Sequence, residues 1–163
     1  MSSLDLVGMI FDAAWRWGLI GSVAFTGMLI IHHFYGPGPD VRDENGKKQI
    51  PPEFRVFVAI EMLLIVTIML GTAIVAIISL RSSWPESLIL DQILTGYAVL
   101  WIINLWDLVV IDWALVVRFR PKWLEVPDTP YFNTMMPHVT GWLLGNLYMI
   151  PFAVLAWWLS TVL

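Results

Sequence analysis

Three acidic residues lie inside long apolar segments of this 163-residue chain. Glu61, Asp107 and Asp112 have mostly aliphatic and aromatic neighbours. A charged side chain at the centre of a bilayer costs about 2.5–3.5 kcal/mol on insertion scales, and such residues commonly mark ligand sites or proton relays. We therefore expect these carboxylates to bind a ligand or accept protons, together with Asn104, which lies one helical turn before Asp107.

The same acids also allow a structural interpretation. Each carboxylate could be paired with an Arg, a His or a Trp N–H. Asp112 is close enough to Arg118 in the sequence to form an ion pair with it at the membrane surface. Both interpretations require that the acids face protein rather than lipid. We expect Glu61 and Asp107 each to have a hydrogen-bond partner on another helix or to line a water-filled cavity.

Histidines at the ends of two apolar segments suggest a metal or haem site. Imidazole and carboxylate groups suit zinc, iron and manganese. The hypothetical metal ligands come one from each apolar segment: His33, Glu61, Asp112 and His138. The two histidines alone, His33 and His138, would hold a haem through both axial positions. The chain has no cysteine, which excludes disulfides, thiolate metal sites and iron–sulfur clusters.

Helix geometry predicts where these side chains lie. At about 1.5 Å of rise per residue, Glu61 and Asp112 should lie about 6 Å and about 4–5 Å inside the same membrane surface, with Asp107 deeper. At about 100° per residue, His33 continues a stripe of small residues on its helix, whereas the adjacent His32 points elsewhere. Asp107 and Asp112 are five residues apart, about 140° around an α-helix, so they need not share a pocket.

Four long apolar runs must position these groups. Each exceeds the roughly 20 residues that a helix needs to cross about 30 Å of hydrocarbon, where a helix satisfies its own backbone. Hydrophobic residues make up 58% of the chain and charged residues 13%, against about 45–50% and about 25% in soluble domains. We predict an all-α membrane protein, with four transmembrane helices in an antiparallel bundle and a single integral membrane domain, 1–163. The predicted helices are Ala14–Tyr35, Phe54–Leu80, Ile93–Val117 and Val139–Leu163.

Basic residues are distributed unequally between the predicted loops. Seven of the nine Lys and Arg residues fall in the loops after the first and third helices, and only Arg16 and Arg81 fall on the opposite side. The positive-inside rule therefore predicts that these two loops are cytoplasmic and that both termini lie outside, in a bacterial inner (plasma) membrane. The net charge of −4 leaves no basic patch for nucleic acid. The seven residues are Arg42, Lys47, Lys48, Arg55, Arg118, Arg120 and Lys122.

Other residues indicate how the helices meet lipid and each other. The chain is rich in tryptophan, with ten residues, and many fall near predicted helix ends, as in the aromatic belts of membrane proteins. Gly141 and Gly145 have the GxxxG spacing that lets helices approach closely. Asp12 and Arg16 are spaced for an ion pair on one helix. We expect contact with the lipid bilayer and with further copies of the chain or partner subunits.

A run of polar and aromatic residues continues from the third predicted helix to the start of the fourth. It contains Asn104, Asp107, Asp112-Trp113, His138 and Gly141. This run resembles a pattern in small bacterial four-helix integral membrane proteins of uncharacterised function. The resemblance implies the same architecture and no particular activity.

Three functions remain open on the sequence. The first is a polar site, open to the cytoplasmic leaflet, that binds a metal, haem or a small polar ligand. The second is a structural or accessory subunit of a larger membrane complex. The third is a small oligomeric ion- or proton-coupled transporter with Asp107 as the carrier. The HExxH, GxGxxG, GxxxxGK[ST] and GxSxG motifs are absent, so no catalytic residue is identified and the sequence does not decide whether the protein is an enzyme.

Overall fold

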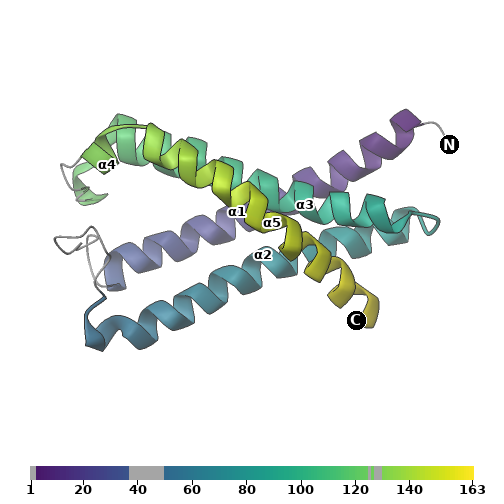
Figure 1. Ribbon diagram of the computed structural model, residues 1–163, viewed down its shortest axis with the longest axis horizontal. Coiled ribbons are helices and arrows are strands. Elements are labelled where there is room, and N and C mark those ends of the chain that lie inside the picture. Colours follow the sequence, from purple (N-terminus) through teal and green to yellow (C-terminus); the bar gives the residue numbers. More distant parts are fainter. Residues whose placement is uncertain (1–2, 37–49, 125, 127–129) are drawn as a thin grey trace.

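The computed structural model describes residues 3–36, 50–124, 126 and 130–163. Long helices make up almost all of this part, and it contains no β-strand. The long elements are α1 (Ser3–Tyr35), α2 (Arg55–Ser83), α3 (Ile89–Trp106), its continuation η2 (Asp107–Phe119) and α5 (Met136–Val162) (Figure 1). The short ones are η1 (Pro52–Phe54), η3 (Lys122–Leu124) and α4 (Pro130–Asn133).

The four long helices are long and apolar enough to cross a membrane. The candidate spans are Leu4–Tyr35, Pro52–Ser83, Ile89–Phe119 and Met136–Val162. The prediction of four such helices is confirmed. The first begins at Ser3 rather than at Ala14, because the residues that we expected to precede it continue the helix.

The two ends of the molecule differ in what connects the helices. The start of α1, the end of α5 and the turn between α2 and α3 lie at one end, which we call the turn end (Figure 1). The elements η1, η3 and α4 lie at the other, which we call the loop end (Figure 1). Of the basic residues used to predict orientation, Arg42, Lys47 and Lys48 lie outside the described residues.

The apolar core lies in the half of the molecule nearer the turn end. Small residues on α2 and α5 let these helices approach α3, where the larger core side chains are fully buried. Helix α1 also packs closely, since a Cβ atom at Gly21 would lie 2.6 Å from Ile103 Cδ1. The core residues are Ala14, Ala73, Ala76, Ile77, Val99, Leu100, Ile102, Ile103, Met149, Ala153 and Ala156.

Hydrogen bonds from Arg81 to Gln92 and Ser160 link three helices at the turn end, and we call these contacts the polar clamp. Arg81 Nε donates to Gln92 Oε1 at 2.7 Å, and its NH1 group donates to the backbone oxygen of Ser160 at 2.7 Å. The first bond joins α2 to α3, and the second satisfies one of the last carbonyls of α5, which have no partner within the helix. The carboxylate of Asp91 accepts a bond from the N–H of Leu88 at 2.9 Å and so caps the start of α3.

The third span changes its helix type halfway along. From Asp107 to Phe119 it is a π-helix, in which hydrogen bonds join residues i and i+5. It ends at Arg120, whose φ of 43° is left-handed and whose N–H bonds to the oxygen of Leu115 at 3.0 Å. Residues five apart therefore lie on the same face of this segment. Our expectation of about 140° between Asp107 and Asp112 assumed an α-helix and is wrong for this segment.

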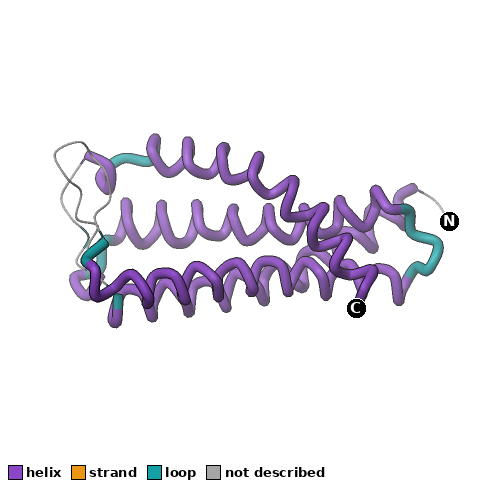
Figure 2. The backbone as a smooth tube through the Cα atoms, turned by 60° about the horizontal axis from the view of Figure 1, so that its bottom comes forward, coloured by secondary structure: helices purple, strands orange, loops and turns teal. Residues whose placement is uncertain are grey.

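Many large apolar side chains are exposed on all four long helices. In the most apolar window of each span, only 17–22% of the residues are buried inside the protein. Large side chains such as Leu63, Leu90 and Leu147 are more than half exposed. Helix α5 changes direction near its middle (Figure 2), and Pro151 within it cannot donate the usual backbone hydrogen bond. Such a surface suits lipid, because water would leave this apolar area unfavourably hydrated.

Candidate functional site

The π-helix and α5 are joined by a carboxylate–imidazole pair near the loop end. Asp112 Oδ1 lies 2.9 Å from His138 Nδ1. His138 is in the first turn of α5 and its side chain is only 5% exposed, whereas that of Asp112 is 22% exposed. Two of the four predicted metal ligands are therefore in contact.

Asp107 belongs to the same group of side chains. The π-helical spacing places it on the same face as Asp112, and its carboxylate lies close enough to Asp112 and His138 to interact electrostatically with both. Among the described residues, no hydrogen bond to the carboxylate of Asp107 is present. The first alternative that we expect for Asp107, a hydrogen-bond partner on another helix, is therefore not met, and the second, a water-filled cavity, stays a prediction.

Two asparagines meet the backbone of α5 further from the loop end. Asn104 Nδ2 and Asn146 Nδ2 donate to the same oxygen, that of Trp142, at 3.2 and 2.8 Å. Asn104 reaches this oxygen because a glycine faces it: a Cβ atom at Gly145 would lie 3.3 Å from Asn104 Nδ2. Gly141 has no atom within 4 Å of such a position. Close approach therefore occurs at the second glycine of the GxxxG motif only.

These residues form one polar line between α3–η2 and α5, which we call the polar seam. On α5 it extends over eight residues from His138, or about 12 Å along the helix axis. Beyond it, towards the turn end, lie Ile103 and Met149 of the apolar core. The seam therefore begins near the loop end and stops at the core. Its members are Asn104, Asp107, Asp112, His138, Trp142 and Asn146.

The third acid makes a separate pair between α1 and α2. Glu61 Oε2 lies 2.5 Å from His32 Nδ1, and the Glu61 side chain is 6% exposed. The expectation that Glu61 bonds to another helix is confirmed. The expectation that His33 rather than His32 faces inward is wrong, because α1 is rotated so that His32 meets α2.

His33 contacts the segment after η2. Its Nε2 atom lies 2.8 Å from the backbone oxygen of Trp123. Its ring also meets the rings of Trp123 and Phe34 edge-on, with centroids 5.8 and 5.0 Å apart. This contact ties the end of α1 to η3 at the loop end.

The four predicted metal ligands do not form one group. Among the described residues, no group of three or more His, Asp or Glu side chains could hold a metal ion. For a haem, His33 would have to give up the bond from its Nε2 atom to the oxygen of Trp123. The acids and histidines that do meet lie in two places: Glu61 with His32, and Asp107 and Asp112 with His138.

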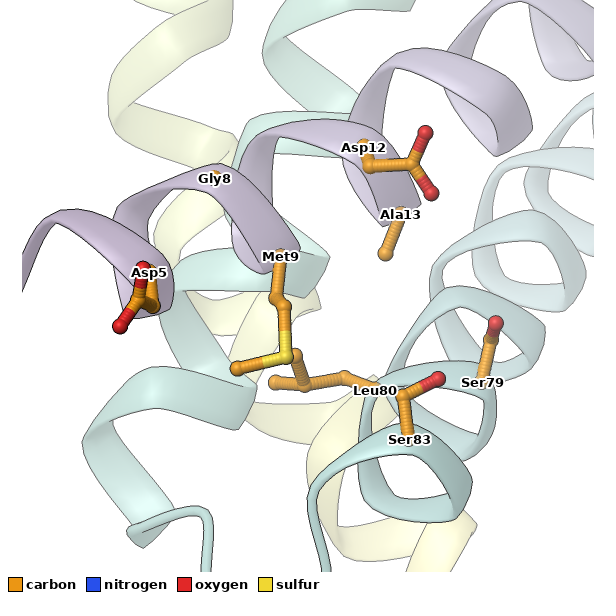
Figure 3. Close-up of a pocket in the computed structure, with 8 residues that line it drawn as sticks. All are labelled: Asp5, Gly8, Met9, Asp12, Ala13, Ser79, Leu80 and Ser83. Carbon is orange, nitrogen blue, oxygen red and sulfur yellow. The ribbon is translucent and has the colours of Figure 1, made fainter. Parts of the chain in front are cut away.

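A pocket lies at the opposite end of the molecule, between the start of α1 and the end of α2 (Figure 3). Its volume is about 280 Å³. Asp12 on its rim pairs with Arg16 at 2.9 Å, as the spacing predicts, with both side chains more than 60% exposed. The pocket is lined by Asp5, Gly8, Met9, Asp12, Ala13, Ser79, Leu80 and Ser83.

Sequence reasoning missed two participants in the polar contacts. The small-residue stripe predicts that His32 points elsewhere, because a one-residue step turns a side chain by about 100° on a helix. Trp142 lies between the two glycines of the GxxxG motif, whose spacing predicts nothing about its polar atoms. Trp142 is four residues after His138 and so lies on the same face of α5. This spacing could have indicated that Trp142 takes part in the polar contacts.

The described part of the chain is helical, with four helices long and apolar enough to span a membrane, as in a polytopic membrane protein. No family model, no curated protein and no solved structure matches the chain.

Proposed function

We propose that this protein accepts protons at the polar seam, from the side of the membrane that faces the loop end. In this proposal the four helices form an antiparallel bundle in a bacterial inner membrane, with both termini outside and the loop end in the cytoplasm. The observation that carries the proposal is the placement of Asp107 and Asp112 on one face of the π-helix, next to His138.

The charges of the seam support proton binding. Two carboxylates face one imidazole, and a proton shared among them removes the repulsion between the two acids. Little water reaches such a site, so an uncompensated negative charge there would be costly. Arg120 is close in sequence to the seam, but its guanidinium donates to Asn133 Oδ1 and to the oxygen of Val126, in the loop-end segment.

The closed inner end of the seam supports a site with access from one side. The apolar core lies between the seam and the turn end. A single copy is therefore better suited to take up and release protons on one side than to move them across. Among the described residues, no group of three or more His, Asp or Glu side chains could hold a metal ion.

Infrared difference spectroscopy tests the proposal directly. We would compare detergent-purified protein at neutral and acidic pH and follow the C=O band of a protonated carboxylic acid in apolar surroundings. Asp107→Asn should remove this band. Asp12→Asn, which changes an exposed acid at the turn end, should leave it unchanged.

The opposite result would refute the proposal. If the Asp107→Asn variant is folded and gives the same buried-acid band as the wild type, Asp107 does not accept the proton. If both variants lose the same signal, the band belongs to exposed acids and the seam has no special part in proton binding.

A further inference from the structure

Two buried polar atoms of the seam lack partners. Trp142 Nε1 is a hydrogen-bond donor and Asn146 Oδ1 is an acceptor, and neither has a partner among the residues that the structure describes. Leaving a buried donor or acceptor unsatisfied costs about 1–3 kcal/mol each. Such atoms in a folded protein therefore point to a bound group that satisfies them.

The two atoms belong to the same part of the seam. Trp142 and Asn146 are one turn apart on α5, and the Asn146 amide already reaches back to the Trp142 oxygen. Asn104, on α3, donates to the same oxygen. The α3 side of the seam therefore contacts α5 at Trp142. Asp107 is one turn from Asn104 and carries the nearest carboxylate along α3–η2.

The chemistry of the two atoms limits what can bind. A metal cation would leave the indole N–H of Trp142 unsatisfied, because that group only donates. An anion would leave the oxygen of Asn146 unsatisfied and would lie near Asp107. A small neutral molecule that both donates and accepts satisfies the two atoms, and water is the smallest such molecule.

We infer that the inner end of the polar seam binds internal water, held by Trp142 Nε1 and Asn146 Oδ1. The inference deepens the proposed function, because this water supplies a hydrogen-bonding group beside Asp107 where the protein supplies none among the described residues. Asp107 then exchanges its proton through water rather than directly with another side chain.

Nuclear magnetic resonance of indole-labelled protein tests this inference. With ¹⁵N in the indole of every tryptophan, each Nε1–H group gives a signal, and loss of one signal in Trp142→Phe assigns that of Trp142. We expect this signal to show a cross-peak with water. The matched control is Trp106, whose Nε1 donates to Thr26 Oγ1 at 3.1 Å and should show no such cross-peak.

A second variant separates water held by the seam from water that merely reaches the indole. Asn146→Leu removes the acceptor and fills its space, so the cross-peak of Trp142 should weaken several-fold while the other indole signals keep their positions. Absence of the cross-peak in the wild type overturns the inference. A cross-peak of unchanged strength in Asn146→Leu also overturns it.

The outcome is independent of the test of proton uptake. If Asp107 gives the buried-acid band but Trp142 shows no contact with water, the proposed function stands and the water site fails. If Trp142 contacts water but Asp107 gives no band, the water site stands and proton uptake fails.

Discussion

The two halves of this molecule use opposite means to hold the same four helices together. Near the turn end, alanines and glycines bring the backbones close around Ile77, Leu100 and Ile103, and the polar contacts lie at the helix ends. Near the loop end, carboxylates, histidines and amides lie between the helices. The apolar half therefore provides stability, and the polar half concentrates the groups that can exchange protons.

The first prediction sharpens this comparison by deciding which half faces the cytoplasm. Alkaline phosphatase, which is active only outside the cytoplasm, should be fully active when fused after Leu163. The same enzyme inserted between residues 40 and 48 should be inactive, because the basic loop residues retain that segment inside. The reverse pattern would make the seam open to the outside.

The second prediction concerns the apolar half. Leu100→Ala should lower the free energy of unfolding by about 2–5 kcal/mol, because Leu100 is fully buried and its loss leaves a cavity. Leu90→Ala on the same helix changes a side chain that is 63% exposed and should shift stability by about 0.5 kcal/mol or less. Denaturant unfolding followed by circular dichroism measures both. Equal losses would show that the core does not hold the helices.

The third prediction tests the clamp at the turn end. Arg81→Met should cost about 2–3 kcal/mol, because it removes two hydrogen bonds from a charged donor and leaves the Gln92 and Ser160 oxygens short of a partner. Arg16→Met removes only an exposed ion pair and should cost about 1 kcal/mol or less. The same unfolding experiment compares the two variants. A smaller loss for Arg81 than for Arg16 would contradict the clamp.

The smallest effect is expected for the pair between α1 and α2. Glu61→Gln keeps the shape and one hydrogen bond to His32 but removes the charge, so stability should fall by about 1 kcal/mol. The buried-acid band of Asp107 should persist, because Glu61 belongs to a separate pair. Glu53→Gln, at an exposed position of η1, is the control. An increase in stability would show that the buried charge of Glu61 weakens the fold.

Composition was enough to predict the four long apolar helices, because a hydrophobic run of this length has few other structures available. The contacts of the polar residues were harder to predict. To predict whether His32 or His33 faces the other helices, the rotation of α1 about its axis must be known to within about 50°, half of the angle between adjacent residues. A stripe of small residues does not define the rotation so closely. Nothing in the residue types of Asp107–Phe119 indicates a π-helix, so the position of Asp107 beside Asp112 could not be predicted, although Asp112 and His138 were expected in one site. Arg81 was interpreted only as a topology signal, although it holds α2, α3 and α5 together.

The π-helix has an evolutionary consequence. Deleting one residue between Asp107 and Asp112 would leave the two acids four apart, which is the spacing that stacks side chains in an ordinary α-helix. A relative of this protein that is one residue shorter there could present the same two carboxylates to the same histidine without a π-helix. Such relatives would carry D-x-x-x-D where this chain has D-x-x-x-x-D. An alignment without a gap in this segment would then fail to match their second aspartate to Asp112.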